Sequence, residues 1–263
     1  MVANLSWLGN NIAMPLLSTH NLTKSFDGVN AVNKLSVTLM PGRITGIIGP
    51  NGSGKSTLIN VLTGMMPFDR GEVIISRRTH LKKIHAHEVP FYGMTRTFQD
   101  VRLFEQLPVL DNILVVLTER SIWSALFEHH TVFHLEQAES VLRKVGLWEK
   151  RNELAKNLSY GQRKLLEIAR VLAIIHDSAG NIDTIFFDEP FAGLFPEMIK
   201  TVITVMKELR DQNRSVVLVE HNMDLIRELS DHLIVLDSGE LLAEGRPAEV
   251  LARKDVIEAY LGE

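Results

Sequence analysis

The sequence of 263 residues contains no cysteine and no long apolar run. Without cysteine the chain forms neither disulfide bridges nor thiolate metal sites, which fits a reducing compartment such as the cytosol. The apolar stretches at residues 113–117 and 171–175 are far shorter than the roughly eighteen residues that a membrane-spanning helix needs. We therefore expect a chain that does not cross a bilayer by itself.

A secretory signal and a surplus of positive charge are also missing. Residues 1–15 show no basic leader followed by an apolar stretch and a small-residue cleavage site, and we interpret them as a polar N-terminal extension. The formal net charge is −4, which argues against a broad basic face. We therefore expect no nucleic-acid partner.

Histidine pairs stand at His85 and His87 and at His129 and His130, but the sequence around them offers no matching cluster of metal ligands. We interpret them as solvated side chains.

The apolar content of 45% is enough for a full hydrophobic core, and the length permits one large domain or two small ones.

A glycine-rich loop lies between a strand-like apolar run at residues 44–48 and a helix-like run at residues 58–62. Its pattern, G-x-x-x-x-G-K-[ST], lets main-chain N–H groups surround a phosphate while the following helix offers its positive end. A turn that only caps a helix is the alternative, but the two flanks favour a phosphate loop. Lys55 would reach the β- and γ-phosphates and Ser56 would bind Mg²⁺. The loop consists of Gly49, Pro50, Asn51, Gly52, Ser53, Gly54, Lys55, Ser56 and Thr57.

The pattern of apolar residues divides the rest of the chain into three parts. Residues 16–76 alternate short apolar runs with turn residues and predict a β-rich part. Residues 109–117 and 134–145 have helical spacing, and the second stretch carries an apolar face formed by Leu135, Ala138, Val141, Leu142 and Val145. From Ser159 onward, helices alternate with buried-looking strands at 184–187, 215–219 and 233–236. This alternation predicts an α/β fold with a parallel sheet covered on both faces.

Two acids, Asp188 and Glu189, directly follow the apolar strand at residues 184–187. A parallel sheet places its ligand site at the carboxyl ends of its strands, so Asp188 would face Mg²⁺. Glu189 is placed to polarise a water molecule for attack on the γ-phosphate. Two surface acids before Pro190 are the alternative, which the upstream phosphate loop makes less favourable.

A serine and a glycine stand at the start of a long helical pattern, in the turn of Ser159, Tyr160, Gly161 and Gln162. Taken alone this is a capped helix that could hold an anion. In order with the phosphate loop and the two acids, however, it resembles the signature of the ATP-binding cassette (ABC) family. Gln99 resembles the family's Q-loop residue, His221 its switch histidine, residues 192–196 its D-loop, and Phe26 the aromatic ring that stacks on adenine.

Parts of the sequence resemble one group of the family more closely. Residues 96–104, 158–162 and 259–263 look like the ATPase subunits of branched-chain amino acid importers, a pattern shared with urea and short-chain amide importers. Residues 188–193 and the same tail are also similar to the ATPase of lipopolysaccharide export. Phe195 stands where the family's D-loop carries Asn or Asp, and the connection at residues 176–183 is longer than is usual.

The resemblance implies a P-loop NTPase (RecA-like) core with an antiparallel β subdomain and a helical signature subdomain. We expect the ABC domain over residues 16–263, with the core and β subdomain at about 16–98 and 164–263 and the helical subdomain at about 99–163. The implied ligands are ATP and Mg²⁺, the latter held by Ser56, Gln99 and Asp188, and the implied catalytic residues are Glu189, His221 and Gln99.

The resemblance also implies partners. The family pairs two ATPase subunits head to tail, so that the signature turn of one covers the ATP on the phosphate loop of the other. The second subunit could be an identical or a related chain. Two transmembrane permease subunits and, indirectly, a solute-binding protein complete the expected complex at the cytoplasmic face of the inner membrane. The apolar stretch at residues 101–117 would either receive a short permease helix or form part of the core.

The expected function is therefore ATP hydrolysis that powers import of branched-chain amino acids or a related small solute. The ATPase of a lipopolysaccharide-type exporter is one alternative. A non-transport ABC ATPase is another, although the paired cassettes, coiled-coil inserts and basic arms common in such proteins are missing from this sequence. A regulatory subunit with poor hydrolysis is a third, because Phe195 replaces the polar D-loop residue.

Overall fold

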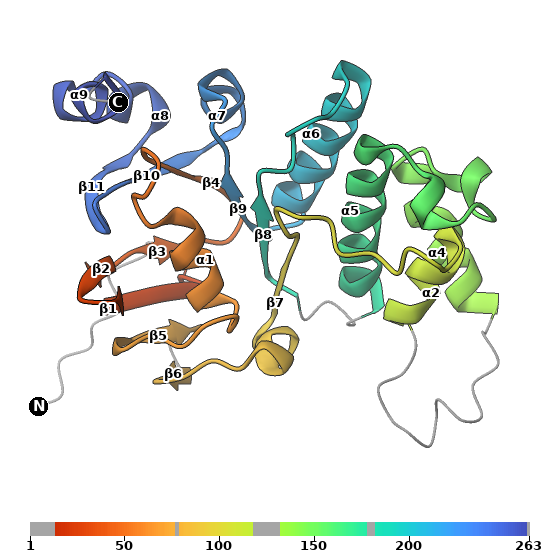
Figure 1. Cartoon of the computed structure of the whole chain (residues 1–263), viewed down its shortest axis with the longest axis horizontal. Coiled ribbons are helices and arrows are strands. Elements are labelled where there is room, and N and C mark those ends of the chain that lie inside the picture. The colour runs from red at the N-terminus through yellow and green to blue at the C-terminus, as the bar shows by residue number, and fades with distance from the viewer. Residues whose placement is uncertain (1–13, 77–78, 118–131, 178–181, 262–263) are drawn as a thin grey trace, which may run out of the picture.

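The computed structural model describes residues 14–76, 79–117, 132–177 and 182–261 (Figure 1). The expected features at residues 1–13, at His129 and His130, at 178–181 and at 262–263 lie outside the described residues. None of the helices described combines the length and the apolar character that crossing a bilayer requires.

The central sheet of the described chain has six strands in the order β11-β10-β4-β9-β8-β7. All neighbours from β10 to β7 are parallel, and β11 is antiparallel to β10. Every residue of β8 and β9 is buried, as is typical of a sheet covered on both faces. The predicted parallel sheet is thus confirmed, with the strands β4 Arg43–Ile48, β7 Met94–Arg96, β8 Thr184–Asp188, β9 Ser215–Val219, β10 His232–Asp237 and β11 Glu240–Gly245.

The two faces of this sheet belong to two hydrophobic cores. Successive side chains of a strand point to opposite faces, so Phe187 packs in the core shared with the helices while Phe186 packs in the core beneath the second sheet. The same alternation separates Ile48 from Ile47 in β4. The sheet is therefore held from both sides, which fixes the positions of its strand ends.

The second sheet is antiparallel and has the order β2-β1-β5-β6, with β3 paired to β1. It packs on α1 through Leu17, Leu22, Leu58 and Ile59, all of which are fully buried. This arrangement confirms the expected β subdomain. The elements are β1 Leu17–Phe26, β2 Val29–Leu35, β3 Thr38–Leu39, β5 Arg70–Ile75, β6 Thr79–Leu81 and α1 Lys55–Leu62.

A helical part lies beside the central sheet, on the right in Figure 1, and consists of α2 Val109–Leu117, α4 Val132–Lys144 and the first turns of α5 Tyr160–Asp177. Ile113, Leu142 and Leu166 form its buried contact. Leu135 was expected on the buried face of α4 but is 42% exposed, so the buried stripe begins one turn later, at Ala138. Because α5 runs unbroken past residue 163, the subdomain boundary expected there stays a prediction.

The remaining helices are the long helix α6, which packs in the core shared with α5, several short connections and a C-terminal group. η1, η2 and η3 are single 3₁₀ segments, and α7, α8 and α9 lie along the β10 and β11 side of the central sheet in Figure 1. Their bounds are η1 Ala86–Tyr92, η2 Trp148–Lys150, η3 Ala155–Asn157, α6 Pro196–Asp211, α7 Met223–Leu229, α8 Pro247–Val250 and α9 Lys254–Leu261.

Phe195 caps the N-terminus of α6, where the side chain makes no capping hydrogen bond, and it is 70% exposed. Asn, Asp and Ser are favoured at this position because their oxygen accepts a hydrogen bond from a free N–H group of the first turn. A phenylalanine here therefore stabilises neither the helix end nor the core of this chain.

We predict that Phe195→Asn raises the free energy of unfolding by about 1 kcal/mol, because asparagine supplies the missing cap. Urea unfolding of the purified protein measures this change. Phe91→Asn is the matched control, since Phe91 is 77% exposed but does not cap an α-helix, and it should give no gain. Equal or lower stability of the Phe195 variant would contradict the capping argument.

Candidate functional site

The phosphate loop lies where the sequence placed it, between β4 and α1. Gly54 precedes the helix with a φ of 99°, and a Cβ atom there would lie 2.2 Å from the main-chain oxygen of Ala31. Only glycine fits this close approach of β2. The buried ammonium group of Lys55 donates hydrogen bonds to the carbonyl oxygens of Gly49 and Pro50 at 2.7 and 2.9 Å. The lysine thus stays inside the loop, at the positive end of α1.

Ser56, Gln99 and Asp188, the three predicted Mg²⁺ ligands, come from separate segments but line one cavity of about 150 Å³. Asp188 ends β8 and is 4% exposed. Its Oδ2 pairs with Nη2 of Arg96 at 3.0 Å, whereas its Oδ1 is buried and has no hydrogen-bond partner among the described residues. Burial raises the pKa of Asp188, although the nearby Arg96 opposes this shift.

These donors fit a magnesium ion. Mg²⁺ prefers oxygen ligands and is usually bound by one or two carboxylates together with substrate phosphates and water. A hydroxyl group, an amide and one carboxylate with an unsatisfied oxygen supply such a set. No group of three or more His, Cys, Asp or Glu side chains that could hold a metal occurs in the described part of the chain, so an ion bound by protein carboxylates alone is not indicated there.

Glu189 and His221, two of the predicted catalytic residues, meet directly. Nε2 of His221 lies 3.0 Å from Oε1 of Glu189, next to the end of β8. The main chain of Glu189 has a φ of 47°, which is unusual for a residue with a side chain, and its N–H donates to the carbonyl of Val219 at 2.9 Å. Glu189 is thus bound to the end of β9 through its main chain.

Two charged residues support this pair and were missed by the sequence analysis. Glu220 follows β9 and is 6% exposed; its carboxylate accepts hydrogen bonds from the N–H groups of Phe191 and His221 at 3.2 and 3.0 Å. Lys164 of α5 is 3% exposed and donates to the main-chain oxygen of Glu189. Burial lowers the pKa of Lys164. An acid directly after a buried strand could have indicated Glu220, but nothing in the sequence distinguishes Lys164 from a surface lysine.

The signature turn begins α5 and forms a capping box. The N–H of Ser159 donates to Oε1 of Gln162 at 3.0 Å, and the N–H of Gln162 donates to Oγ of Ser159 at 3.3 Å. The ring of Tyr160 lies against Gly193, where a Cβ atom would come within 2.8 Å of it. Gly161 is buried beneath, while Ser159 and Tyr160 are exposed. None of these residues lines the cavity shared by Ser56, Gln99 and Asp188.

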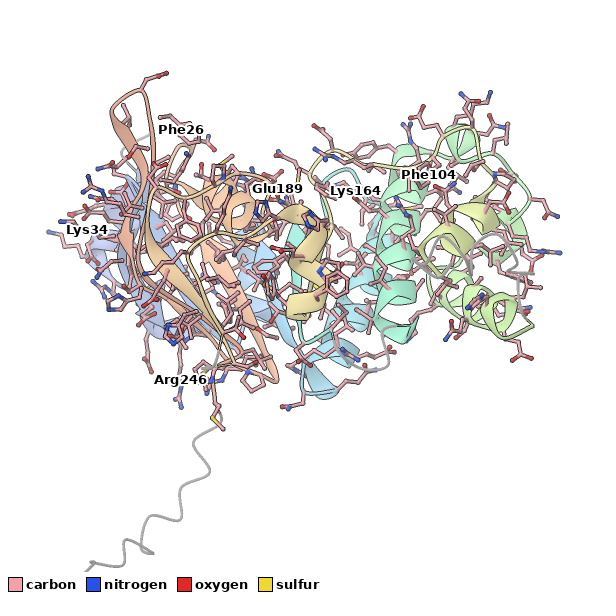
Figure 2. All side chains as sticks on the ribbon, turned by 90° about the horizontal axis from the view of Figure 1, so that it is seen from below. Phe26, Lys34, Phe104, Lys164, Glu189 and Arg246 are labelled. Atoms are coloured by element: carbon pink, nitrogen blue, oxygen red, sulfur yellow. The ribbon has the colours of Figure 1, made fainter. Side chains whose placement is uncertain are left out.

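Phe26 ends β1 and is 45% exposed, with Nζ of Lys24 at 5.2 Å from its ring centre. The hairpin that follows carries Ala31, which touches Gly54 of the phosphate loop. Figure 2 shows Phe26 near one end of the molecule, Phe104 toward the other, and Glu189 and Lys164 between them. Phe26 and Glu189 are therefore separate parts of the predicted site, and the individual roles of the site residues stay predictions.

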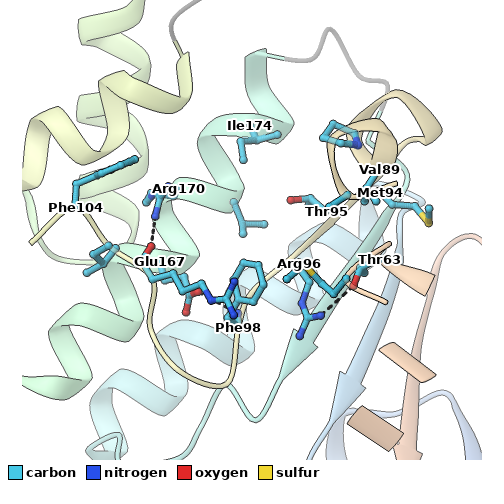
Figure 3. A pocket seen from close by; sticks show the side chains of 16 residues that line it. Thr63, Val89, Met94, Thr95, Arg96, Phe98, Phe104, Glu167, Arg170 and Ile174 are labelled. Carbon is cyan, nitrogen blue, oxygen red and sulfur yellow. Dashed lines mark hydrogen bonds between the residues drawn. The ribbon is translucent and has the colours of Figure 1, made fainter. Parts of the chain in front are cut away.

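A larger cavity of about 680 Å³ lies between β7, η1 and α5 (Figure 3). Met65, Val89, Phe98, Phe104 and Ile174 are among the residues that line it. Of the apolar stretch at residues 101–117, Leu103 and Phe104 line this cavity, whereas Val109, Ile113 and Leu117 of α2 are buried core. The stretch is therefore core in its second half, and its first half belongs to the cavity.

Glu167 and Arg170 of α5 also line this cavity. Oε1 of Glu167 accepts a hydrogen bond from the N–H of Phe98 at 3.0 Å, and Nη1 of Arg170 donates to the carbonyl of Arg102. Both ends of the segment around Gln99 are thus bound to α5. Glu167 is 5% exposed, and burial raises its pKa to about 7.

Comparison with known proteins gives two family matches. The ABC transporter family matches residues 32–192, and the family described as branched-chain amino acid ATP-binding cassette transporter matches residues 240–263. The chain is 37% identical, over 96% of its length and 100% of the relative, to LivG of Escherichia coli (strain K12), a high-affinity branched-chain amino acid transport ATP-binding protein.

Solved structures are similar along the whole chain. The crystal structure of a nucleotide-free ATP-binding cassette from an ABC transporter has a TM-score of 0.81 at 33% identity, covering 95% of this chain and 100% of the other. The ADP conformation of an ATP-binding cassette of an ABC transporter has a TM-score of 0.79 at 34% identity, with the same two coverages.

We predict that Glu167 makes stability depend on pH. Its pKa is about 7 in the folded protein against an ordinary value of 4.5, so folding takes up a proton between these values and stability falls as the pH rises through this range. Relative to Glu167→Gln, the wild-type free energy of unfolding should fall by about 2 kcal/mol from pH 5 to pH 8. Urea unfolding of both proteins measures this difference, and a constant difference across the range would refute the assignment.

Proposed function

The chain belongs to the ABC transporter family, and from this premise we propose that it is the ATP-hydrolysing subunit of an importer for branched-chain amino acids or a related small solute. Likeness to LivG over the full length supports import above lipopolysaccharide export and above the non-transport alternatives. The observation that carries the catalytic part is the contact of Glu189 with His221, beside Asp188 and the phosphate loop.

Binding of ATP follows from the family, and we assign its parts to residues of this chain. Lys55 and the main-chain N–H groups of the loop other than Pro50 would hold the β- and γ-phosphates, and Phe26 would stack on the adenine. Ser56, Gln99 and Asp188 would hold Mg²⁺, which neutralises phosphate charge when bound. The unsatisfied Oδ1 of Asp188 supports this ligand set.

Hydrolysis needs a group that orients the attacking water. Glu189 is placed to accept a proton from that water, because its carboxylate is held by His221 and its main chain by Lys164 and Val219. His221 is 50% exposed, so its ring is able to reach the γ-phosphate as well as Glu189. Gln99 lines the cavity of Asp188 on a segment that is bonded to α5, and it would report the state of the phosphate to the helical part.

The signature turn supports a head-to-tail pair of cassettes. Its exposed Ser159 and Tyr160 lie outside the cavity of the chain's own predicted Mg²⁺ ligands. In a pair, the turn would cover the nucleotide of the neighbour, so that ATP holds two subunits together until it is hydrolysed. The neighbour is an identical or a related ATPase chain. We favour a related chain, because the chain resembles importers of the branched-chain type, which generally pair two different ATPases.

Two permease subunits would bring the chain to the cytoplasmic face of the membrane, and one of them would place a short helix in the 680 Å³ cavity. A solute-binding protein would deliver the solute to the permease subunits. The apolar wall of this cavity suits one face of a short permease helix. Phe104 is 46% exposed at its edge. The cavity also adjoins the segment of Gln99, so a helix seated in it would contact the residues that respond to ATP.

We predict that Glu189→Gln leaves ATP binding intact and lowers turnover at least about a hundredfold, as expected for loss of a general base. The variant should also form an ATP-dependent dimer, measured by size-exclusion chromatography. Glu197→Gln makes the same change at an exposed carboxylate and should hydrolyse ATP normally. Lys55→Ala should instead weaken nucleotide binding. Near-normal turnover of the Glu189 variant would show that the base is elsewhere.

We also predict that Phe104→Asp lowers recruitment of the protein to permease-containing membranes at least about tenfold, because it places a charge at the apolar cavity. Co-sedimentation with these membranes measures the effect. Ile257→Asp in α9 is the control, since Ile257 is 44% exposed and does not line the cavity. Unchanged recruitment of the Phe104 variant would move the permease contact to another face.

A further inference from the structure

Arg96 contacts each of the three segments that carry the predicted Mg²⁺ ligands. We propose that Arg96 is a positioning residue for this site, holding Asp188, Gln99 and Ser56 in their common cavity. This inference rests on the proposed ATPase function and deepens it. The resemblance assigned no role to Arg96, whose position at the end of β7 marks it only as the residue three places before Gln99.

The guanidinium group is fixed by four hydrogen bonds. Nη2 binds Asp188 at 3.0 Å, and Nε donates to the carbonyl of Thr97 at 3.0 Å. Nη1 donates to Oδ1 of Asn60 at 2.8 Å and to Oγ1 of Thr63 at 2.9 Å, the latter drawn in Figure 3. Because the planar fork of arginine presents its donors in fixed directions, these bonds together allow one orientation of the side chain.

These contacts connect Arg96 to the segments of the predicted ligands. Asp188 is bound directly through Oδ2, and its buried Oδ1 has no hydrogen-bond partner among the described residues. Asn60 lies one helical turn after Ser56 on α1, so both side chains share one face of that helix. The ring centre of Phe98, which precedes Gln99, lies 4.6 Å from the Arg96 guanidinium.

A second cation also contacts the ring of Phe98. The guanidinium of Arg102 lies 4.2 Å from the ring centre, so two cations bind this side chain. Its N–H donates to Glu167. The main chain directly before Gln99 is therefore held. Thr97 connects it to the main chain of Asp188, and Arg96 connects it to the carboxylate.

Stability alone does not account for the pair of Arg96 with Asp188. Their side chains are 8% and 5% exposed, and removing two such charges from water costs more than their attraction commonly returns. Apolar residues would fill the same space at lower cost. An ion pair at the end of a buried strand, beside a cavity with an unsatisfied carboxylate oxygen, indicates instead that the orientation of the carboxylate matters.

The test measures how much Mg²⁺ raises the affinity for a non-hydrolysable ATP analogue, by calorimetric titration in Mg²⁺ and in EDTA. Arg96→Gln should lower this Mg²⁺ factor about tenfold or more, the usual effect of losing a group that orients a metal ligand. Affinity in EDTA should stay within about twofold, because the phosphate loop is unchanged. Arg214→Gln removes another half-buried arginine, which donates to the carbonyl of Ile182 and does not line the cavity of Asp188, and it should retain the factor.

Arg96→Lys tests the positioning role of Arg96 if the glutamine variant does not fold. A lysine keeps the charge near Asp188 but lacks the fork, so the Mg²⁺ factor should still fall at least about threefold. A wild-type Mg²⁺ factor in either Arg96 variant, or an equal loss in Arg214→Gln, overturns the positioning role while leaving the ATPase assignment intact. If Mg²⁺ does not raise the affinity of the wild-type protein for the ATP analogue, both the positioning role and the ATPase assignment are overturned.

Discussion

Three parallel strands, β4, β9 and β8, end level with one another, and the chemistry of the molecule depends on that register. Val219 at the end of β9 pairs with Ile47 on one side and with Asp188 on the other. The phosphate loop, the two acids and the Glu220–His221 turn therefore leave the sheet at the same edge. Burial on both faces keeps the strands from slipping, since a shift by one residue would exchange the contents of the two cores.

Features that are local in sequence could be predicted from it. The phosphate loop is a continuous run with diagnostic flanks, and the acids after β8 are marked by the apolar strand before them. The parallel sheet follows from the alternation of strands and helices. Gln99 and His221 gained meaning only through their order relative to these motifs, and the structure brings Gln99 beside Asp188 and His221 beside Glu189.

Contacts between distant residues could not be predicted in this way. Arg96 and Asp188 are separated by 92 positions, and Lys164 reaches Glu189 across 25. A lone arginine or lysine in a sequence usually indicates a solvated side chain, and only packing reveals that these two are buried. The stretch at residues 101–117 was undecided for the same reason, because core and exposed cavity wall share one composition. Leu135 continues the apolar period of α4 but lies beyond its packed part.

Lys164 has a consequence for paired cassettes. It stands on the first turns of α5, behind the tip that would rest on a neighbour's nucleotide, and its ammonium group is bonded to the backbone of Glu189. This bond couples the two positions in both directions. If the neighbour's triphosphate displaced the helix end, the carboxylate of Glu189 would move with it, and hydrolysis in one subunit would depend on the nucleotide bound to the other.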